Sequence, residues 1–177
     1  QLCSLPDTQI VDMSSFYESE PAYYEDQDAF VNAVVLLRSG LPPKELLGYL
    51  HSIENSLGRV RAIENGPRTL DIDILDYQMY VASDDELTLP HPRVTERDFV
   101  VKPVLEILPG WELADGTPVG RVPEAERVGQ VQQDTWLHDF IGGKKAVQRQ
   151  RNTAVLRFCM GKCGFRRLLK RIVERSQ

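Results

Sequence analysis

The sequence has no long apolar segment and few cysteines. No run of about 18 apolar residues, which a membrane-spanning helix requires, occurs among the 177 residues. The first residues lack the basic start and the apolar stretch of a secretory signal. The three cysteines are widely scattered, which gives no disulfide framework and favours a reducing compartment. We therefore expect a protein without a membrane span, located in the cytoplasm.

Basic residues are scarce before residue 144 and abundant after it. Residues 1–143 contain 10 Lys or Arg against 25 Asp or Glu, whereas residues 144–177 contain 11 against one. This asymmetry predicts a globular domain over residues 1–143 and a basic tail over residues 144–177. Helical spacing of apolar residues predicts an amphipathic helix in the tail, with an apolar face made by Phe165, Leu168, Leu169 and Ile172.

The basic tail has several candidate partners. An anionic membrane or a nucleic acid would attract a basic amphipathic helix. We favour docking of the tail on the acidic part of the same chain, or a tail without fixed structure, over either external partner. On this interpretation a chain that ends near Gly143 is expected to fold.

Apolar periodicity predicts an α+β fold. Strands are expected within residues 9–17 and 29–39 and from residue 70 onward, and the second is apolar on both faces and therefore central. Pro42 and Pro43 are expected to open a helix that Gly58 ends. Strands and helices segregated in this way indicate a sandwich with a mainly antiparallel sheet.

Two aspartates interrupt a segment that otherwise has the pattern of a buried strand, GPRTLDIDIL at residues 66–75. On a strand, Asp71 and Asp73 project to the same face about 6–7 Å apart, where like charges repel. A divalent cation would remove the repulsion, and Mg²⁺ is commonly held by one or two carboxylates together with substrate phosphates. Without a cation, replacing either aspartate is expected to leave stability unchanged or to raise it slightly.

Arginines gather around this aspartate segment. Five of the ten basic residues before residue 144 lie near it: Arg59, Arg61, Arg68, Arg93 and Arg97. Guanidinium groups bind two phosphate oxygens at once, so the combination favours a site for metal and phosphate. The alternative is a half-exposed strand with solvated aspartates and surface arginines.

The longer pattern resembles one enzyme family. The segments LGRVRAIENGPRTLDIDILDY and LTLPHPRVTERDFVVKPVLEILP, preceded by VDMSSFYESEP and FVNAVVLL, resemble 6-hydroxymethyl-7,8-dihydropterin pyrophosphokinase over residues 1 to about 120. The resemblance implies a ferredoxin-like α+β sandwich. It also implies transfer of pyrophosphate from ATP to the hydroxymethyl group of the pterin, with Mg²⁺ as cofactor.

The resemblance implies a role for each matching residue. Arg59 and Arg68 are implied to clamp the phosphates as catalytic residues, and Asp71 and Asp73 to bind the metal. The residues implied to bind ATP are Glu54, Arg61, Ile74, Thr88, His91 and Arg97. The residues implied to bind the pterin are Ser19, Glu20, Pro21, Phe30, Asn32 and Phe99. Taken without the resemblance, Asn32 is better explained as a core amide that the chain itself satisfies.

The resemblance also implies a strand that the first residues do not supply. Family members begin with a central strand carrying Gly-Ser-Asn and a helix, whereas residues 1–12 match only the end of that helix and the approach to the second strand. We therefore expect either a fragment of a longer protein, or a vacated strand position filled by the tail or a partner chain. The alternative function is a weakly active or inactive relative that serves as a nucleotide-binding or assembly module.

Overall fold

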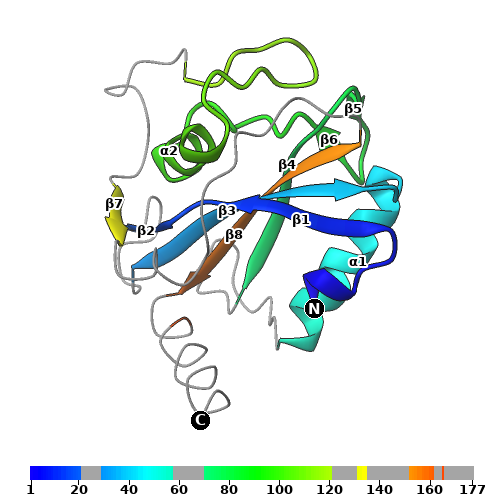
Figure 1. The fold of residues 1–177 in the computed structure, drawn as a ribbon, viewed down its shortest axis with the longest axis horizontal. Helices are drawn as coiled ribbons and strands as arrows, with labels where there is room; N and C mark the ends of the chain where they lie inside the picture. The colour runs from blue at the N-terminus through cyan, green and yellow to red at the C-terminus, as the bar shows by residue number, and fades with distance from the viewer. Residues whose placement is uncertain (21–28, 58–69, 121–130, 135–151, 162–164, 166–177) are drawn as a thin grey trace.

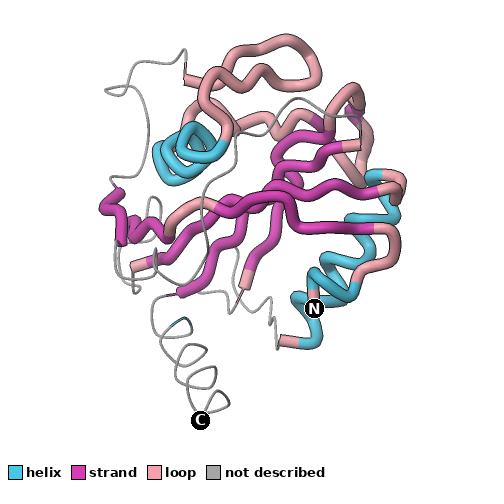
Figure 2. Tube along the Cα trace, viewed as in Figure 1, coloured by secondary structure: helices cyan, strands magenta, loops and turns pink. Residues whose placement is uncertain are grey.

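The computed structural model describes residues 1–20, 29–57, 70–120, 131–134, 152–161 and 165. Within these ranges the chain is an α+β fold with an antiparallel sheet, which confirms the predicted class (Figures 1 and 2). The elements in chain order are the short 3-10 helix η1 (Leu2–Ser4), strands β1 (Thr8–Met13), β2 (Phe16–Ser19) and β3 (Phe30–Ser39), helix α1 (Pro43–Ser56), strands β4 (Asp71–Tyr77), β5 (Ala82–Ser83) and β6 (Thr88–Leu89), helix α2 (Asp98–Ile107), and strands β7 (Val131–Asp134) and β8 (Thr153–Gly161).

The main sheet has the strand order β4-β8-β3-β2-β7, and β1 also pairs with β3. The single strand predicted over residues 9–17 is in fact two strands, because Ser14 and Ser15 interrupt it between β1 and β2. At this break Ser14 replaces part of the ladder: its N–H donates to the Val34 carbonyl, and its hydroxyl accepts the Val34 N–H at 2.9 Å. Both strands therefore run along the same edge of β3.

Strand β8 lies inside the sheet, between β3 and the edge strand β4 (Figure 1). It pairs antiparallel with β3 from Phe30↔Gly161 to Arg38↔Thr153. It pairs antiparallel with β4 from Asp71↔Cys159 to Tyr77↔Ala154. A strand from the predicted tail thus occupies a position inside the sheet, as expected if the tail fills a vacated strand position.

This position of β8 argues against the expectation that a chain ending near Gly143 folds. Such a chain would leave β3 and β4 with unpaired backbone groups along their facing edges. The predicted amphipathic helix of the tail lies outside the described residues apart from Phe165. That ring is buried against Phe16, with the two ring centroids 4.8 Å apart.

The two helices cover opposite faces of the sheet, because alternate strand residues point to opposite sides. One hydrophobic cluster joins α2 to the sheet through Val101, Val104, Val34, Leu36 and Val155. The other joins α1 to the sheet through Leu46, Leu50, Val35, Leu37 and Leu156. No helix among the described residues is long and apolar enough to cross a membrane.

Candidate functional site

The two aspartates of the predicted metal site lie at the start of β4 and bind a side chain from β8. Arg157 Nε donates to Asp73 Oδ2 at 3.0 Å, and Arg157 Nη2 donates to the same oxygen. Arg157 Nη2 also lies 3.4 Å from Asp71 Oδ2, and Nη1 donates to Asn32 Oδ1 at 3.3 Å. Only 6% of Arg157 is exposed. One buried guanidinium therefore joins side chains from both neighbouring strands.

Strand register brings these groups together. Asp73 is directly opposite Arg157, while Asp71 is opposite Cys159, which is itself opposite Asn32. Residues opposite one another in an antiparallel pair share a face, and residues two apart on a strand do so as well. The carboxylates, the guanidinium and the amide thus lie on the same face of the sheet, the face that α2 covers.

Arg157 supplies the positive charge that the paired aspartates need. Burial by itself would lower the pKa of Arg157, but the negative charges of Asp73 and Asp71 outweigh burial and raise that pKa above its usual value. The guanidinium therefore stays charged, and the repulsion expected between the carboxylates is compensated inside the chain. The sequence pattern explained the pair by a metal ion, or by solvation on a half-exposed strand, and did not include this cation.

Phe99, on the first turn of α2, lies close to two arginines. Its ring centroid is 5.5 Å from the Arg157 guanidinium carbon and 5.6 Å from that of Arg97, the residue that precedes α2. Both distances are typical of a cation–π contact. The structure therefore brings two predicted binding residues, Phe99 and Arg97, to the aspartate face.

His91 also lies within the electrostatic reach of this cluster. Its backbone N–H donates to the Leu75 carbonyl at 2.8 Å, and its Nδ1 accepts the Arg93 N–H at 3.2 Å. Burial lowers the pKa of His91, and the charge of Asp73 opposes that effect only in part. The imidazole is therefore neutral near pH 7 and can offer a hydrogen bond without adding charge.

The predicted pterin residues are only partly described. Asn32 is 1% exposed, donates through Nδ2 to Ser19 Oγ at 2.9 Å and accepts from Arg157. This pattern matches the alternative of a core amide satisfied by the chain. Phe30 pairs with Ser19 across β2 and β3, Glu20 is exposed, and Pro21 lies outside the described residues. Their role toward a pterin stays a prediction.

Three other predicted ATP residues lie on the α1 side of the sheet or on β6. Ile74 is 4% exposed and packs in the cluster under α1, so its side chain points to the opposite face of the sheet. Glu54 lies buried on α1, where its Oε1 accepts the Ile72 N–H at 2.7 Å and thereby binds a backbone donor of β4. Thr88 is exposed on β6. The predicted residues Arg59, Arg61 and Arg68 lie outside the described residues.

The aspartate pair fits a hard divalent cation in its chemistry. Mg²⁺ takes one or two carboxylates from a protein when phosphate oxygens and water complete its shell. Among the described residues, no group of three or more His, Cys, Asp or Glu gathers to form a richer ligand set. Any cation held by these two carboxylates would depend on bound phosphate or water for the rest of its coordination.

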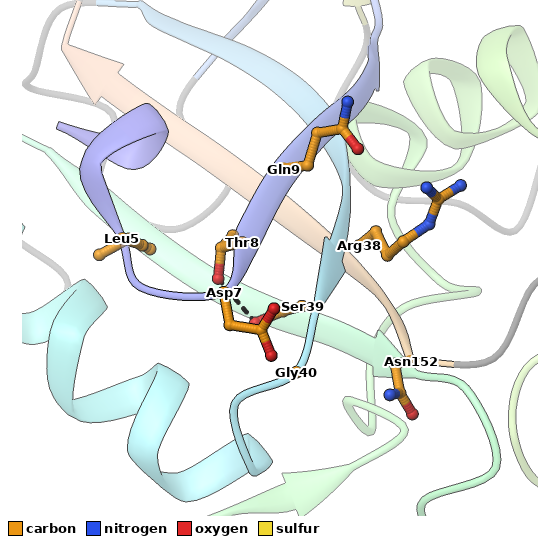
Figure 3. A pocket seen from close by; sticks show the side chains of 8 residues that line it. All are labelled: Leu5, Asp7, Thr8, Gln9, Arg38, Ser39, Gly40 and Asn152. Atoms are coloured by element: carbon orange, nitrogen blue, oxygen red, sulfur yellow. Dashed lines mark hydrogen bonds between the residues drawn. The ribbon is translucent and has the colours of Figure 1, made fainter.

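A separate polar pocket lies at the other end of the sheet (Figure 3). Its volume is about 480 Å³, and it is lined by Leu5, Asp7, Thr8, Gln9, Arg38, Ser39, Gly40 and Asn152. A hydrogen bond of 2.8 Å between the hydroxyls of Thr8 and Ser39 closes one side. The pocket contains none of the predicted site residues and lies beyond the strand ends opposite the aspartates.

Comparison with known proteins places the first part of the chain in a defined group. The family model for 7,8-dihydro-6-hydroxymethylpterin-pyrophosphokinase matches residues 1–109. The chain is 45% identical over 104 residues to the "Folic acid synthesis protein fol1" of Pneumocystis carinii, covering 59% of this chain and 14% of that protein. It is 44% identical over 108 residues to the 2-amino-4-hydroxy-6-hydroxymethyldihydropteridine pyrophosphokinase of Methylorubrum extorquens, covering 61% of this chain and 68% of that protein.

Coverage differs among the relatives. The pyrophosphokinase of Bacillus subtilis is 45% identical over 98 residues, which are 55% of this chain and 59% of that protein. The chain thus spans less than two thirds of several relatives, and β8 lies beyond the matched family segment. Because the family model covers more than half of the residues, the chain belongs to the 7,8-dihydro-6-hydroxymethylpterin-pyrophosphokinase family.

Proposed function

We propose that the chain transfers pyrophosphate from ATP to 6-hydroxymethyl-7,8-dihydropterin, a step of folate synthesis in the cytoplasm. The observation that carries the proposal is the gathering of Asp71, Asp73, Arg97 and Phe99 at one face of the sheet, within the segment that matches the family. Carboxylates for a cation, a guanidinium for phosphate and an aromatic ring for a flat heterocycle are the groups that this reaction requires.

The roles of the phosphate-binding residues follow from their chemistry. Asp71 and Asp73 would hold Mg²⁺, which when bound neutralises charge on the phosphates. Arg97 and neutral His91 are proposed to contact ATP, and the transfer itself requires mainly alignment and charge compensation. Arg59 and Arg68, on the segment just before β4, are proposed to clamp the phosphates, and Arg61 to contact ATP beside them. Phe99 and Asn32 are proposed to bind the pterin ring.

A second candidate function has a specific observation in its favour. Arg157 binds both aspartates, so the site as folded already contains a cation where a metal-dependent enzyme needs carboxylate ligands. A weakly active or inactive relative that binds nucleotide, or acts in assembly, would have this property.

An assay of AMP release separates the two functions. The full chain is mixed with ATP, MgCl₂ and 6-hydroxymethyl-7,8-dihydropterin, because bonding of the hydroxymethyl oxygen to the β-phosphorus releases AMP. We expect pterin-dependent AMP release that Arg68→Ala greatly reduces and that Asp85→Asn, at an exposed turn, leaves unchanged. Calorimetric binding of ATP without AMP release would instead support the nucleotide-binding module.

A further inference from the structure

We propose that Arg157 is an internal counter-ion that competes with a divalent cation for Asp71 and Asp73. The inference rests on the proposed function, which assigns these two aspartates to the metal. It concerns a residue outside the matched family segment, since that segment ends at residue 109.

The contacts place the guanidinium where a bridging cation would bind. Arg157 Nη2 contacts one carboxylate oxygen of Asp71 and one of Asp73, so a single nitrogen lies between both groups. An ion shared by the carboxylates would need the same space and would approach the same oxygens. Two cations held there together would repel each other, and burial of the site strengthens that repulsion. Binding of a divalent cation at the pair therefore requires Arg157 to leave it.

Arg157 is held firmly in this position. Its Nη1 donates to Asn32, its guanidinium contacts the ring of Phe99, and only 6% of the residue is exposed. Its backbone belongs to a strand that pairs along both edges, so the residue cannot withdraw without a change in side-chain rotamer or in the sheet. Release of the guanidinium must therefore weaken the apparent affinity of the aspartates for a cation.

Removing the guanidinium should raise that affinity. Arg157→Met keeps an unbranched chain about as long as the aliphatic part of arginine but leaves the carboxylates without this counter-charge. A neighbouring guanidinium lowers the affinity of a carboxylate for a proton by about 10- to 1000-fold, and it opposes the binding of a divalent cation in the same way. We expect Arg157→Met to bind a divalent cation more tightly than the wild type by a factor in this range.

The test is a titration of the full chain with MnCl₂, in which electron paramagnetic resonance measures free Mn²⁺. It is run with and without α,β-methylene-ATP, an analogue that supplies phosphate oxygens but cannot release AMP. Arg38→Met is the matched control, because Arg38 is an exposed residue near the far end of β3. We expect tighter Mn²⁺ binding and a larger Mn²⁺-dependent rise in Tm for Arg157→Met than for the wild type or the control.

A second variant protects the test against failure to fold. Arg157→Lys keeps one positive charge, but an ammonium is a point charge that does not engage two carboxylates through a planar fork. We expect its Mn²⁺ affinity to lie between those of the wild type and Arg157→Met. If Arg157→Met folds only when Mn²⁺ is present, that result also supports competition, because the added cation then replaces the lost counter-ion.

Two results would overturn the proposal, and they differ in their meaning. Equal Mn²⁺ affinity in the wild type and in both Arg157 variants would refute competition while leaving the metal assignment intact. Absence of Mn²⁺ binding in every variant, with the analogue present, would refute both competition and the metal assignment. Pyrophosphate transfer is judged separately by AMP release, so failure of that function alone would not produce either result.

Discussion

Replacing Asp73 with asparagine should destabilise the protein in the absence of metal. Asp73 Oδ2 accepts from both Nε and Nη2 of Arg157, so it is the main partner of a buried guanidinium. The pattern of two like charges on one strand predicted the opposite, a neutral or slightly stabilising change. Arg157 reverses the sign, because the substitution removes an attraction as well as a repulsion.

The magnitude follows from burial of the pair. Removing one partner of a buried ion pair costs about 3–5 kcal/mol. The Asp73 side chain is 28% exposed, and asparagine keeps a carbonyl oxygen that still accepts a hydrogen bond. We therefore expect Asp73→Asn to lower the free energy of unfolding by about 2–3 kcal/mol.

Urea unfolding in buffer with EDTA measures this difference without interference from divalent cations. Asp85→Asn is the matched control, since the same chemical change at an exposed turn should alter stability by less than about 0.5 kcal/mol. An Asp73→Asn protein as stable as the wild type, or more stable, would refute the role of Arg157 as the counter-ion in the folded chain.

Three further outcomes are expected. Leu156→Ala, at a fully buried position of β8, should lower the free energy of unfolding in urea by about 2–5 kcal/mol, and a loss below about 1 kcal/mol would contradict a core position. Glu106→Gln should lower the free energy of unfolding by about 1–3 kcal/mol in the same assay. The carboxylate accepts three hydrogen bonds from Ser15 and Tyr17, whereas an amide has one acceptor oxygen. An unchanged urea midpoint would contradict this. Burial lowers the pKa of His91 below 6.5, so the unfolded chain takes up a proton at this residue more readily than the folded chain does. The stability that the neutral His91 contributes is therefore complete above pH 6.5 and is lost as the pH falls. His91→Gln should therefore lose less stability than the wild type between about pH 7 and pH 5, and equal losses in urea titrations would refute this.

Local sequence pattern was sufficient to predict those features whose residues lie close together in the chain. The apolar run over residues 29–39 predicted a buried strand, and β3 is central in the observed sheet. Pro42 and Pro43 predicted the start of α1, which begins at Pro43. The period of two along β4 placed Asp71 and Asp73 on one face, as their shared contact with Arg157 requires.

Contacts between segments far apart in the chain could not be predicted from local sequence pattern. The basic composition of residues 144–177 suggested a tail, although the segment TAVLRFCMG within it has the β-branched and aromatic residues of a strand. Arg157 lies 84 residues from Asp73 and 125 from Asn32 along the chain, so no local spacing connects them. Together with this strand-like composition, the expectation of a vacated central strand could have directed attention to residues 153–161.

For a related physical reason, the sheet includes residues beyond the charge boundary near residue 143. Hydrogen bonding along both edges and burial of both faces stabilise a strand at such a position. The net charge of the surrounding segment carries no information about either. Ala154, Val155 and Leu156 are each at most 1% exposed, even though basic residues surround them in sequence. The single charge buried in this strand, Arg157, is compensated by the aspartates.

The position of β8 between β3 and β4 is the feature on which the whole candidate site depends. Hydrogen exchange of backbone amides in the intact chain, followed by mass spectrometry, tests it directly. Because both edges of β8 are paired, its amides over Thr153–Gly161 should exchange as slowly as those of Phe30–Ser39, through global unfolding alone. Exchange of the Thr153–Gly161 amides within seconds, while Phe30–Ser39 stays protected, would contradict the position of β8 between β3 and β4 and with it the pairing of Arg157 with the aspartates.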